Sequence, residues 1–234
     1  MNKQTNKKPA IVLLSGGLDS ATTLAYAINE NFHCYALSFI YGQKHNIEIE
    51  HAKKIAKFYH ISKRHKIIKL DKRLFLSSAL TAKQNMPENR DLTQISKDIP
   101  PTYVPARNTI FLSMALAFAE QINAFDIFIG ANAIDYSGYP DCRPEFIKAF
   151  EKLANLGTKA GIEGNKITIH APLINLTKSD IIKLGKKLGL DYSLTWSCYN
   201  PQADKLACGK CDSCIIRKNA FKQAGFKDPI EYID

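Results

Sequence analysis

The sequence lacks any long hydrophobic run. In its 234 residues no uninterrupted apolar stretch approaches the roughly 20 residues that a membrane-spanning helix needs. The first segment, MNKQTNKKPA, is polar and basic, and it has neither the apolar centre nor the cleavage site of a signal peptide. We therefore expect a cytoplasmic protein without a membrane segment, in which residues 1–9 form a disordered arm.

Internal repeats, low-complexity segments and an aromatic-interleaved RNA-binding module are also missing. Acidic residues are in deficit, because 32 Lys and Arg face 22 Asp and Glu, which gives a net charge of +10. ATP, a carboxylate substrate or RNA would all suit that charge. The basic residues are densest between Lys44 and Arg73, where helical periodicity predicts a solvated helix face. We therefore do not expect nucleic acid as a partner.

Cysteine is scarce outside one cluster near the end of the chain. Cys34 and Cys142 are isolated, and we interpret them as packing residues. The remaining four, separated by nine, two and two residues, have a spacing typical of a tetrahedral Zn²⁺ site, and they are Cys198, Cys208, Cys211 and Cys214. An iron–sulfur cluster is the alternative. Because all four ligands would come from protein, we predict a structural metal in a reducing compartment.

Short apolar segments alternate with helical patterns along most of the chain. The predicted strands cover residues 10–14, 33–39, 66–70, 126–130 and 167–171, and the predicted helices cover 20–29, 46–59, 107–121, 144–156, 177–189 and 212–223. This alternation predicts an α/β fold with a doubly wound, mostly parallel five-stranded sheet. We expect a nucleotide-binding α/β domain over 10–190 and a small, helical zinc-binding segment over 191–234. The proline-rich loop 81–105 is interpreted as an active-site flap.

A glycine-rich loop, SGGLDS, joins the first predicted strand to the first helix at residues 15–20. Its backbone N–H groups at a helix N-terminus, with the serine hydroxyls, are suited to phosphate. The loop lacks the lysine that a kinase-type phosphate loop carries. Asp19 would repel phosphate unless a Mg²⁺ ion lay between them. We therefore predict a nucleotide phosphate site with Mg²⁺ near Asp19.

Polar residues also gather where later strands end. The segment DYSGYPDCRPEF follows the fourth predicted strand, and its charged candidates are Asp135, Asp141, Arg143 and Glu145. A carboxylate there could accept hydrogen bonds from a guanine-like edge, and an arginine could pair with a substrate carboxylate. A surface turn with capping side chains is the alternative.

Two predicted helices begin with polar residues of undecided role. Arg107 and Asn108 start an otherwise apolar helix, where they either cap it or face a ligand at the mouth of the sheet. Lys178 starts the helix after the fifth strand, where a lysine is unfavourable unless an anion lies nearby. A solvated lysine is the alternative.

These motifs resemble those of a known superfamily. SGGLDS resembles the pyrophosphate loop of the N-type ATP pyrophosphatases (the PP-loop superfamily), which have an adenine nucleotide alpha-hydrolase-like fold. YVPARNTIFLSMALAFAE at 103–120, GANAIDYSGYPDCRPEF at 130–146 and the four-cysteine tail resemble the 7-cyano-7-deazaguanine synthase family of queuosine precursor biosynthesis. The resemblance runs from about Ala10 to about Gly225.

The resemblance implies a carbon–nitrogen ligase that uses ATP with Mg²⁺. Such an enzyme adenylates the carboxylate of 7-carboxy-7-deazaguanine, forms an amide with ammonia, then adenylates the amide to give the nitrile, releasing AMP and pyrophosphate. It implies catalytic roles for Asp19 and Lys178, substrate contacts at Arg107, Asn108 and 135–145, and a homodimer. The implied ATP ligands are Lys178 together with Leu14, Ser15, Gly16, Gly17, Leu18, Asp19, Ser20, Ala21 and Thr22.

Two alternatives remain from the sequence. A PP-loop tRNA sulfurtransferase would need a reactive cysteine or a cluster, together with an RNA-binding module. A zinc-ribbon nucleic-acid-binding protein without catalysis would leave the phosphate loop unexplained.

Overall fold

A computed structural model describes residues 7–43, 46–81, 88–91, 99–134, 139–201 and 206–233. A five-stranded sheet runs through its centre in the order β3-β2-β1-β4-β5, and every neighbouring pair is parallel. The strands are β1 (Pro9–Leu13), β2 (His33–Ile40), β3 (His65–Lys69), β4 (Asp126–Phe128) and β5 (Thr168–His170). The predicted parallel α/β fold is therefore confirmed.

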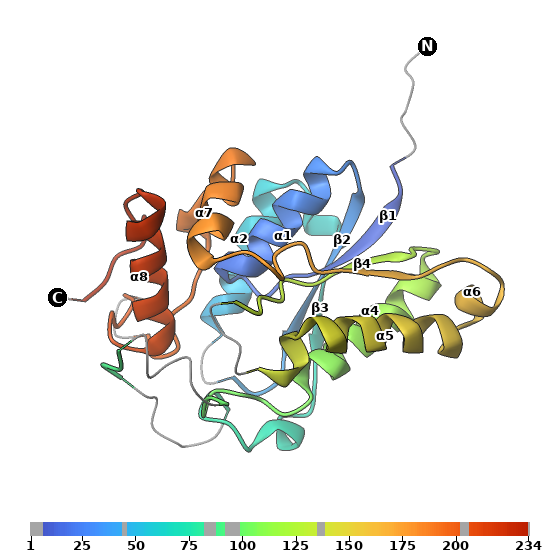
Figure 1. Cartoon of the computed structure of the whole chain (residues 1–234), viewed down its shortest axis with the longest axis horizontal. Coiled ribbons are helices and arrows are strands. Elements are labelled where there is room, and N and C mark those ends of the chain that lie inside the picture. Colours follow the sequence, from blue (N-terminus) through green and yellow to red (C-terminus); the bar gives the residue numbers. More distant parts are fainter. Residues whose placement is uncertain are drawn as a thin grey trace, which may run out of the picture.

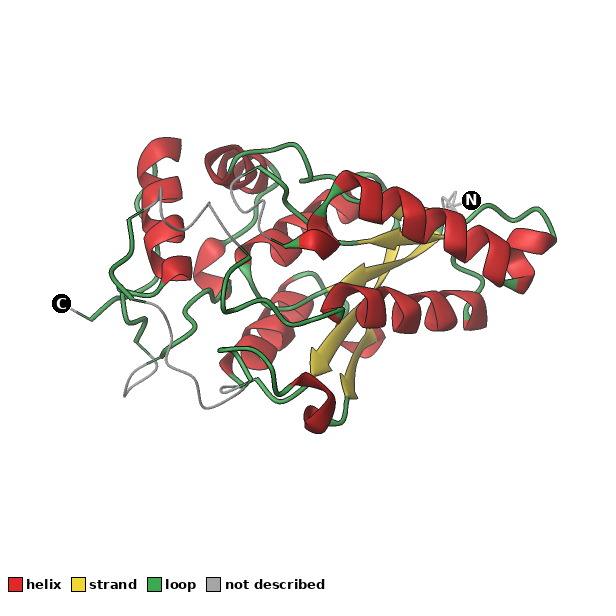
Figure 2. Cartoon of the chain, turned by 60° about the horizontal axis from the view of Figure 1, so that its bottom comes forward, coloured by secondary structure: helices red, strands yellow, loops and turns green. Residues whose placement is uncertain are grey.

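Helices cover both faces of this sheet (Figures 1 and 2). One face carries α1 (Leu18–Asn29), α2 (Ile47–Phe58), α7 (Lys178–Lys187) and α8 (Asp212–Ala224). The other face carries α4 (Arg107–Gln121), α5 (Pro144–Gly157) and α6 (Lys159–Ile162). Short 3₁₀ turns are η1 (Ser62–Arg64), η2 (Lys72–Phe75), η3 (Pro140–Cys142) and η4 (Tyr192–Leu194).

The central strand β1 is apolar throughout because both of its faces are covered by helices. Ala10 and Val12 of β1 pack into the core under α1, whereas Ile11 and Leu13 pack into the core under α4. Successive side chains of a strand point to opposite faces, so a strand covered on both faces is apolar throughout. The next strand along the chain, β2, lies on one side of β1, and β4 lies on the other side of β1. The direction in which strands are added to the sheet therefore reverses between β1 and β4. Ligands bind at such a switch point in open α/β sheets.

A buried tyrosine ties the first helix to the C-terminal segment. The Tyr192 hydroxyl lies 2.8 Å from the Thr22 hydroxyl and donates a hydrogen bond to the carbonyl of Ile181 at 2.9 Å. Gly185 makes room for it, because a Cβ at that position would lie 2.0 Å from the Tyr192 oxygen. Ala220 and Phe221 of α8 join the same core cluster. The C-terminal segment therefore packs directly onto the α/β domain.

The predicted elements differ from the observed ones mainly at their ends. β4 and β5 are each shorter than predicted, and α6 was not predicted. Thr177 caps α7, its hydroxyl accepting the Asp180 N–H at 3.2 Å. Residues 82–87 and 92–98 of the 81–105 loop fall outside the described residues, as does the arm before residue 7. Among the described residues, no helix combines the length and apolar character required to cross a membrane.

Candidate active site and metal centre

The loop between β1 and α1 is fixed by short-range hydrogen bonds. The Ser20 hydroxyl accepts the N–H of Ser15 at 3.1 Å, lies 3.0 Å from the Ser15 hydroxyl, and donates to the carbonyl of Gly17 at 3.0 Å. The Gly17 N–H reaches the Ser15 hydroxyl at 3.2 Å. Gly17 is also the N-cap of α1, and it offers no side chain to the first turn. The N-terminal end of α1 therefore remains available to an anion.

A glycine is required at position 16. Its φ of +92° lies in the left-handed region, and a Cβ there would come within 2.1 Å of the carbonyl oxygen of Glu48 at the start of α2. The Gly16 carbonyl accepts the N–H of Trp196 at 2.9 Å. The loop is thereby held between the N-terminus of α2 and the C-terminal segment.

Asp19 and Lys178, which the sequence places far apart, form an ion pair. Their side chains are 28% and 18% exposed, so the pair is only partly in contact with solvent. One oxygen of Asp19 contacts the lysine, and the other is buried without a hydrogen-bond partner in the described part of the chain. A buried carboxylate oxygen without a partner is costly unless a ligand or ion completes it.

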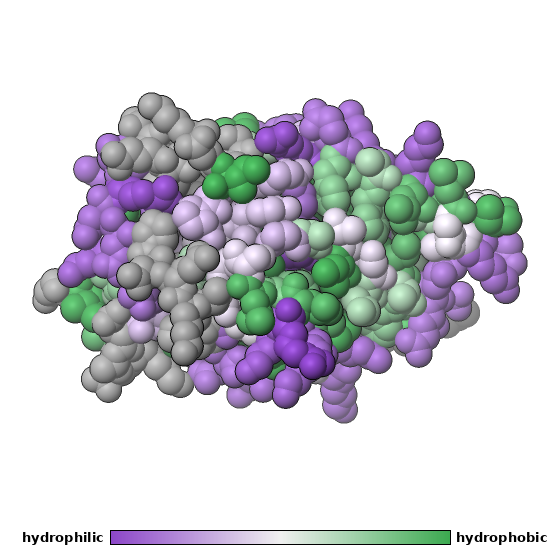
Figure 3. Space-filling view, turned by 90° about the horizontal axis from the view of Figure 1, so that it is seen from below, coloured by the Kyte–Doolittle hydropathy of each residue, from purple (hydrophilic) through white to green (hydrophobic). Residues whose placement is uncertain are grey.

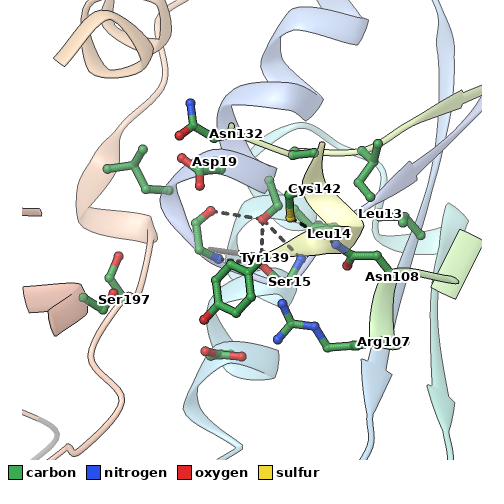
Figure 4. A pocket seen from close by; sticks show the side chains of 18 of the residues that line it. Leu13, Leu14, Ser15, Asp19, Arg107, Asn108, Asn132, Tyr139, Cys142 and Ser197 are labelled. Carbon is green, nitrogen blue, oxygen red and sulfur yellow. Dashed lines mark hydrogen bonds between the residues drawn. The ribbon is translucent and has the colours of Figure 1, made fainter. Parts of the chain in front are cut away.

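These residues line a pocket of about 300 Å³ at the switch point of the sheet (Figure 4). Its volume lies at the lower end of the roughly 300–1,000 Å³ that is usual for small-molecule sites. In Figure 4, Asp19 and Asn132 lie at one side of the view and Arg107 at the other. Arg107 reaches the Tyr41 hydroxyl, Tyr41 packs against Phe111, and Phe111 stacks on Phe39, so this side of the lining is aromatic. Tyr139 lines the pocket as well.

Three predicted ATP ligands do not line this pocket. Gly16 has no side chain, and its carbonyl bonds to Trp196. Ala21 and Thr22 are fully buried beneath the loop. The Thr22 hydroxyl donates to the carbonyl of Leu18 at 2.9 Å and lies beside Tyr192. The predicted ligands that do line the pocket are Leu14, Ser15, Gly17, Leu18, Asp19, Ser20 and Lys178.

Arg107 and Asn108 both line the pocket at the start of α4, but in different ways. Arg107 donates to the Tyr41 hydroxyl at 3.3 Å. Asn108 is buried, and its side-chain amide donates to the carbonyl of Asp141 at 3.0 Å and to the Cys142 sulfur at 3.3 Å. Ala106 before them has φ +54°, an uncommon conformation for a residue with a side chain. Asn108 therefore anchors the helix, and Arg107 is the residue whose charged group faces the pocket.

The charged residues that the structure describes in the 135–145 segment lie outside the pocket lining. Asp141 is buried, and its carboxylate accepts the N–H of Asn108 at 3.0 Å, while Arg143 and Glu145 are exposed at the start of α5. None of these three lines the pocket, and Asp135 lies outside the described residues. Their assignment as substrate ligands stays a prediction. Within the described part of this segment, Tyr139 and Cys142 reach the pocket instead.

The four clustered cysteines form a compact centre beside the start of α8. All four are buried, and their sulfur atoms lie within 4.8 Å of one another. Thiolates around one tetrahedral zinc at about 2.3 Å are separated by about 3.8 Å, so this set fits a single ion. The sulfurs also accept backbone N–H groups, from Cys208 to Cys198 and from Cys211 to Cys208, each at 3.3 Å. Gly209, with φ +70°, makes the turn between the ligands.

The chain is similar to a known protein family over nearly its whole length. The model of the family described as queuosine biosynthesis protein QueC matches residues 9–225. This chain belongs to the QueC family. A protein of Desulfatibacillum aliphaticivorans is 57% identical over 228 residues, which cover 97% of each chain. One of Picrophilus torridus is 58% identical over 225 residues, covering 96% of this chain and 92% of that protein. Both are named 7-cyano-7-deazaguanine synthase.

In this QueC-family chain the pocket also contains an acid that the sequence reasoning missed. Glu48, in the first turn of α2, lines the pocket. Burial raises its pKa to about 6, and the charge of Arg107 opposes that rise. Its place in the first turn of the predicted helix 46–59, which follows the second predicted strand, was the available signal. The aromatic lining from β2 and α4 was missed as well, because those residues read equally well as core.

The cysteines outside the four-cysteine cluster have the character predicted for packing residues. Cys34 is buried, and burial raises its pKa to about 12. Burial likewise raises the pKa of Cys142 to about 11, although this residue borders the pocket. Both thiols are therefore protonated at neutral pH, which makes them poor nucleophiles.

Proposed function

We propose that this chain is an ATP-dependent carbon–nitrogen ligase that converts 7-carboxy-7-deazaguanine and ammonia into 7-cyano-7-deazaguanine. The observation that carries the proposal is the shared pocket: in a QueC-family chain, the phosphate loop with its Asp19–Lys178 pair faces the same space as Arg107 and an aromatic wall. Such a pocket can hold a nucleotide phosphate chain next to a flat, carboxylated heterocycle.

At the loop end, the β- and γ-phosphates would rest on the backbone and hydroxyl groups of Ser15 to Ser20. The unpartnered oxygen of Asp19 fits Mg²⁺, a hard cation that is bound through carboxylate and phosphate oxygens. Bound there, Mg²⁺ would neutralise charge on the departing pyrophosphate. Lys178 supplies a second positive charge from α7. The absence of a lysine within SGGLDS is thus compensated by a distant helix.

The proposed reaction has two adenylations. The substrate carboxylate attacks the α-phosphorus of ATP and expels pyrophosphate, and ammonia then displaces AMP to give the amide. The amide oxygen attacks the α-phosphorus of a second ATP and expels a second pyrophosphate, and the adenylated amide then loses AMP and its nitrogen-bound protons to leave the nitrile. Positioning and electrostatic stabilisation of the leaving pyrophosphate provide the catalysis. Cys142 takes no covalent part, because its thiol stays protonated.

We further propose that the cysteine centre holds one structural zinc ion. Four protein thiolates leave no open position for chemistry. The sulfur separations support a single ion over an iron–sulfur cluster, in which iron and sulfide atoms lie between the thiolates and spread them further apart. Four reduced, clustered thiols also suit the reducing cytoplasm, where we expect this protein to act.

A homodimer is the proposed assembly. Figure 3 shows apolar side chains gathered on the face over α4 and α5. Exposed apolar residues on these helices and on α6 include Met114, Leu153, Leu156 and Ile162. Apolar patches of this kind commonly mark contact surfaces. A second copy packed there would cover the patch.

The proposed reaction is tested by incubating the protein with Mg-ATP, ammonium and 7-carboxy-7-deazaguanine. We expect two AMP and two pyrophosphate for each nitrile formed, measured by chromatography and mass spectrometry. Glutamine should not replace ammonium, because no glutaminase-like segment is evident in the sequence. Release of ADP and phosphate, or AMP formation that does not depend on the deazaguanine acid, would contradict the proposal.

A further inference from the structure

The aromatic end of the pocket contains one acid whose role is not yet explained. Within the described residues, the acids that line the pocket are Asp19 and Glu48. Asp19 is engaged by Lys178 at the phosphate loop. Asp141 and Glu145, which the sequence offered as base-reading acids, do not line the pocket. Among the described acids that line the pocket, Glu48 is therefore the one that is available to a ligand at the aromatic end.

Glu48 is also held in a defined place. Its backbone carbonyl packs against Gly16, so closely that no side chain could stand there. The charge of Arg107, at the start of α4, acts on the Glu48 carboxylate, and burial together with the charge of Glu48 raises the pKa of the Tyr41 hydroxyl, after β2. Arg107 is in turn bonded to Tyr41. An acid, an arginine and an aromatic hydroxyl from three different elements thus meet at one point of the pocket.

The surroundings of Glu48 suit a flat heterocycle. The rings of Phe39 and Phe111 stack with centroids 4.1 Å apart and an interplanar angle of 6°. The Tyr41 ring packs against Phe111 edge-on at 5.4 Å, and Tyr139 completes this aromatic lining. Aromatic walls bind planar rings through stacking and apolar contact. Such walls do not distinguish one planar ring from another, so the polar groups beside them must do so.

We propose that Glu48 recognises the N1–H and 2-amino edge of the deazaguanine substrate and thereby sets specificity for a guanine-type ring. This inference rests on the proposed function. An ionised carboxylate accepts both hydrogen bonds side by side, which a hydroxyl cannot do. A glutamine in its place offers one acceptor and turns its own NH₂ toward a donor. The backbone of Glu48 adjoins the phosphate loop at Gly16, but we expect its side chain to take no part in phosphate binding.

Ionisation of Glu48 gives the recognition a pH dependence. Burial raises its pKa to about 6, so the residue is charged at neutral pH and becomes protonated below about 6. The protonated form loses an acceptor. We therefore expect the KM for the deazaguanine acid to rise as the pH falls through about 6, and we expect Glu48→Gln to lose that pH dependence.

The decisive experiment combines a residue change with a substrate change. Glu48→Gln should raise the KM for 7-carboxy-7-deazaguanine roughly 10- to 100-fold, the range expected for loss of one bidentate contact. The KM for ATP should change little. The second probe is the analogue that lacks the 2-amino group. The native protein should bind it more weakly than the substrate, and Glu48→Gln should bind both compounds about equally. Glu50→Gln, an exposed change on the same helix, is the matched control.

Three outcomes would overturn the proposal. The first is that Glu48→Gln retains the full preference for the 2-amino group, and the second is that it lowers kcat alone. The third is that a higher concentration of free ammonia relieves its defect, which would indicate proton removal from ammonium. Circular dichroism checks folding, and Glu48→Asp, with a shorter reach, should be intermediate in KM. If the native protein shows no turnover, the proposed function fails, and calorimetric binding of the two compounds still tests Glu48.

Discussion

The two ends of the pocket are built in different ways. At the phosphate end, one continuous segment from Leu14 to Ser20 supplies backbone and hydroxyl groups that are fixed by their own hydrogen bonds. At the aromatic end, side chains from β2, α2, α4 and the segment before α5 meet only because the fold brings them together. Local bonds shape most of the first end, with Trp196 and Lys178 contacting it from elsewhere in the chain, whereas the second end depends on tertiary packing throughout. Changes that disturb the packing of β2 and α4 should therefore harm substrate recognition more than phosphate binding.

Removal of the metal should have the largest effect and should affect both ends. Trp196, which donates to the carbonyl of Gly16, also bonds through its indole to the carbonyl of Cys198 at 3.0 Å. A structural zinc contributes roughly 10–16 kcal/mol to folding. Chelation or Cys211→Ser should therefore release the C-terminal segment and abolish ATP binding, measured by hydrogen exchange and calorimetry.

Metal analysis of the purified, colourless protein should give about one zinc per chain and no iron. The control is Cys34→Ser, since Cys34 lies far along the chain from the centre and is expected to keep the metal. A brown, iron-containing protein would contradict the zinc assignment. Full ATP binding after complete zinc removal would contradict the coupling to the phosphate loop.

Asp19→Asn should impair the phosphate end of the pocket and leave binding at the aromatic end intact. The change keeps the shape of the side chain but removes the charge that opposes Lys178 and would hold Mg²⁺. We expect turnover to fall roughly 100-fold or more, as when a charge-stabilising group is removed from a transition state. Steady-state AMP release and a thermal melt measure the two effects. Binding of 7-carboxy-7-deazaguanine should persist. Unchanged turnover would remove the proposed role of Asp19.

The same contrast explains which parts of the site could be predicted from sequence. The phosphate loop and the cysteines are contiguous or closely spaced motifs, whose chemistry follows from residue type and interval. Lys178 was recognisable because a lysine at a helix start needs an anion. Glu48 was missed because its place in the site depends on the packing of α2 against Gly16. The polar residues around Asp141 were predicted to bind substrate because they are close together in the sequence. Spacing alone does not show which of them face the pocket and which, like Asp141, bond to a neighbouring helix.

Asp141→Ala should produce the smallest effect and would sharpen the contrast. Its carboxylate accepts the N–H of Asn108 at the start of α4, so its loss should cost about 1–2 kcal/mol of stability, as for a lost helix cap. Because that helix start also carries Arg107, we expect a rise of only a few-fold in the KM for the deazaguanine acid. Glu145→Ala, on the exposed start of α5, is the control and should change neither quantity. A rise in KM as large as that of Glu48→Gln, with unchanged stability, would show instead that Asp141 contacts the substrate directly.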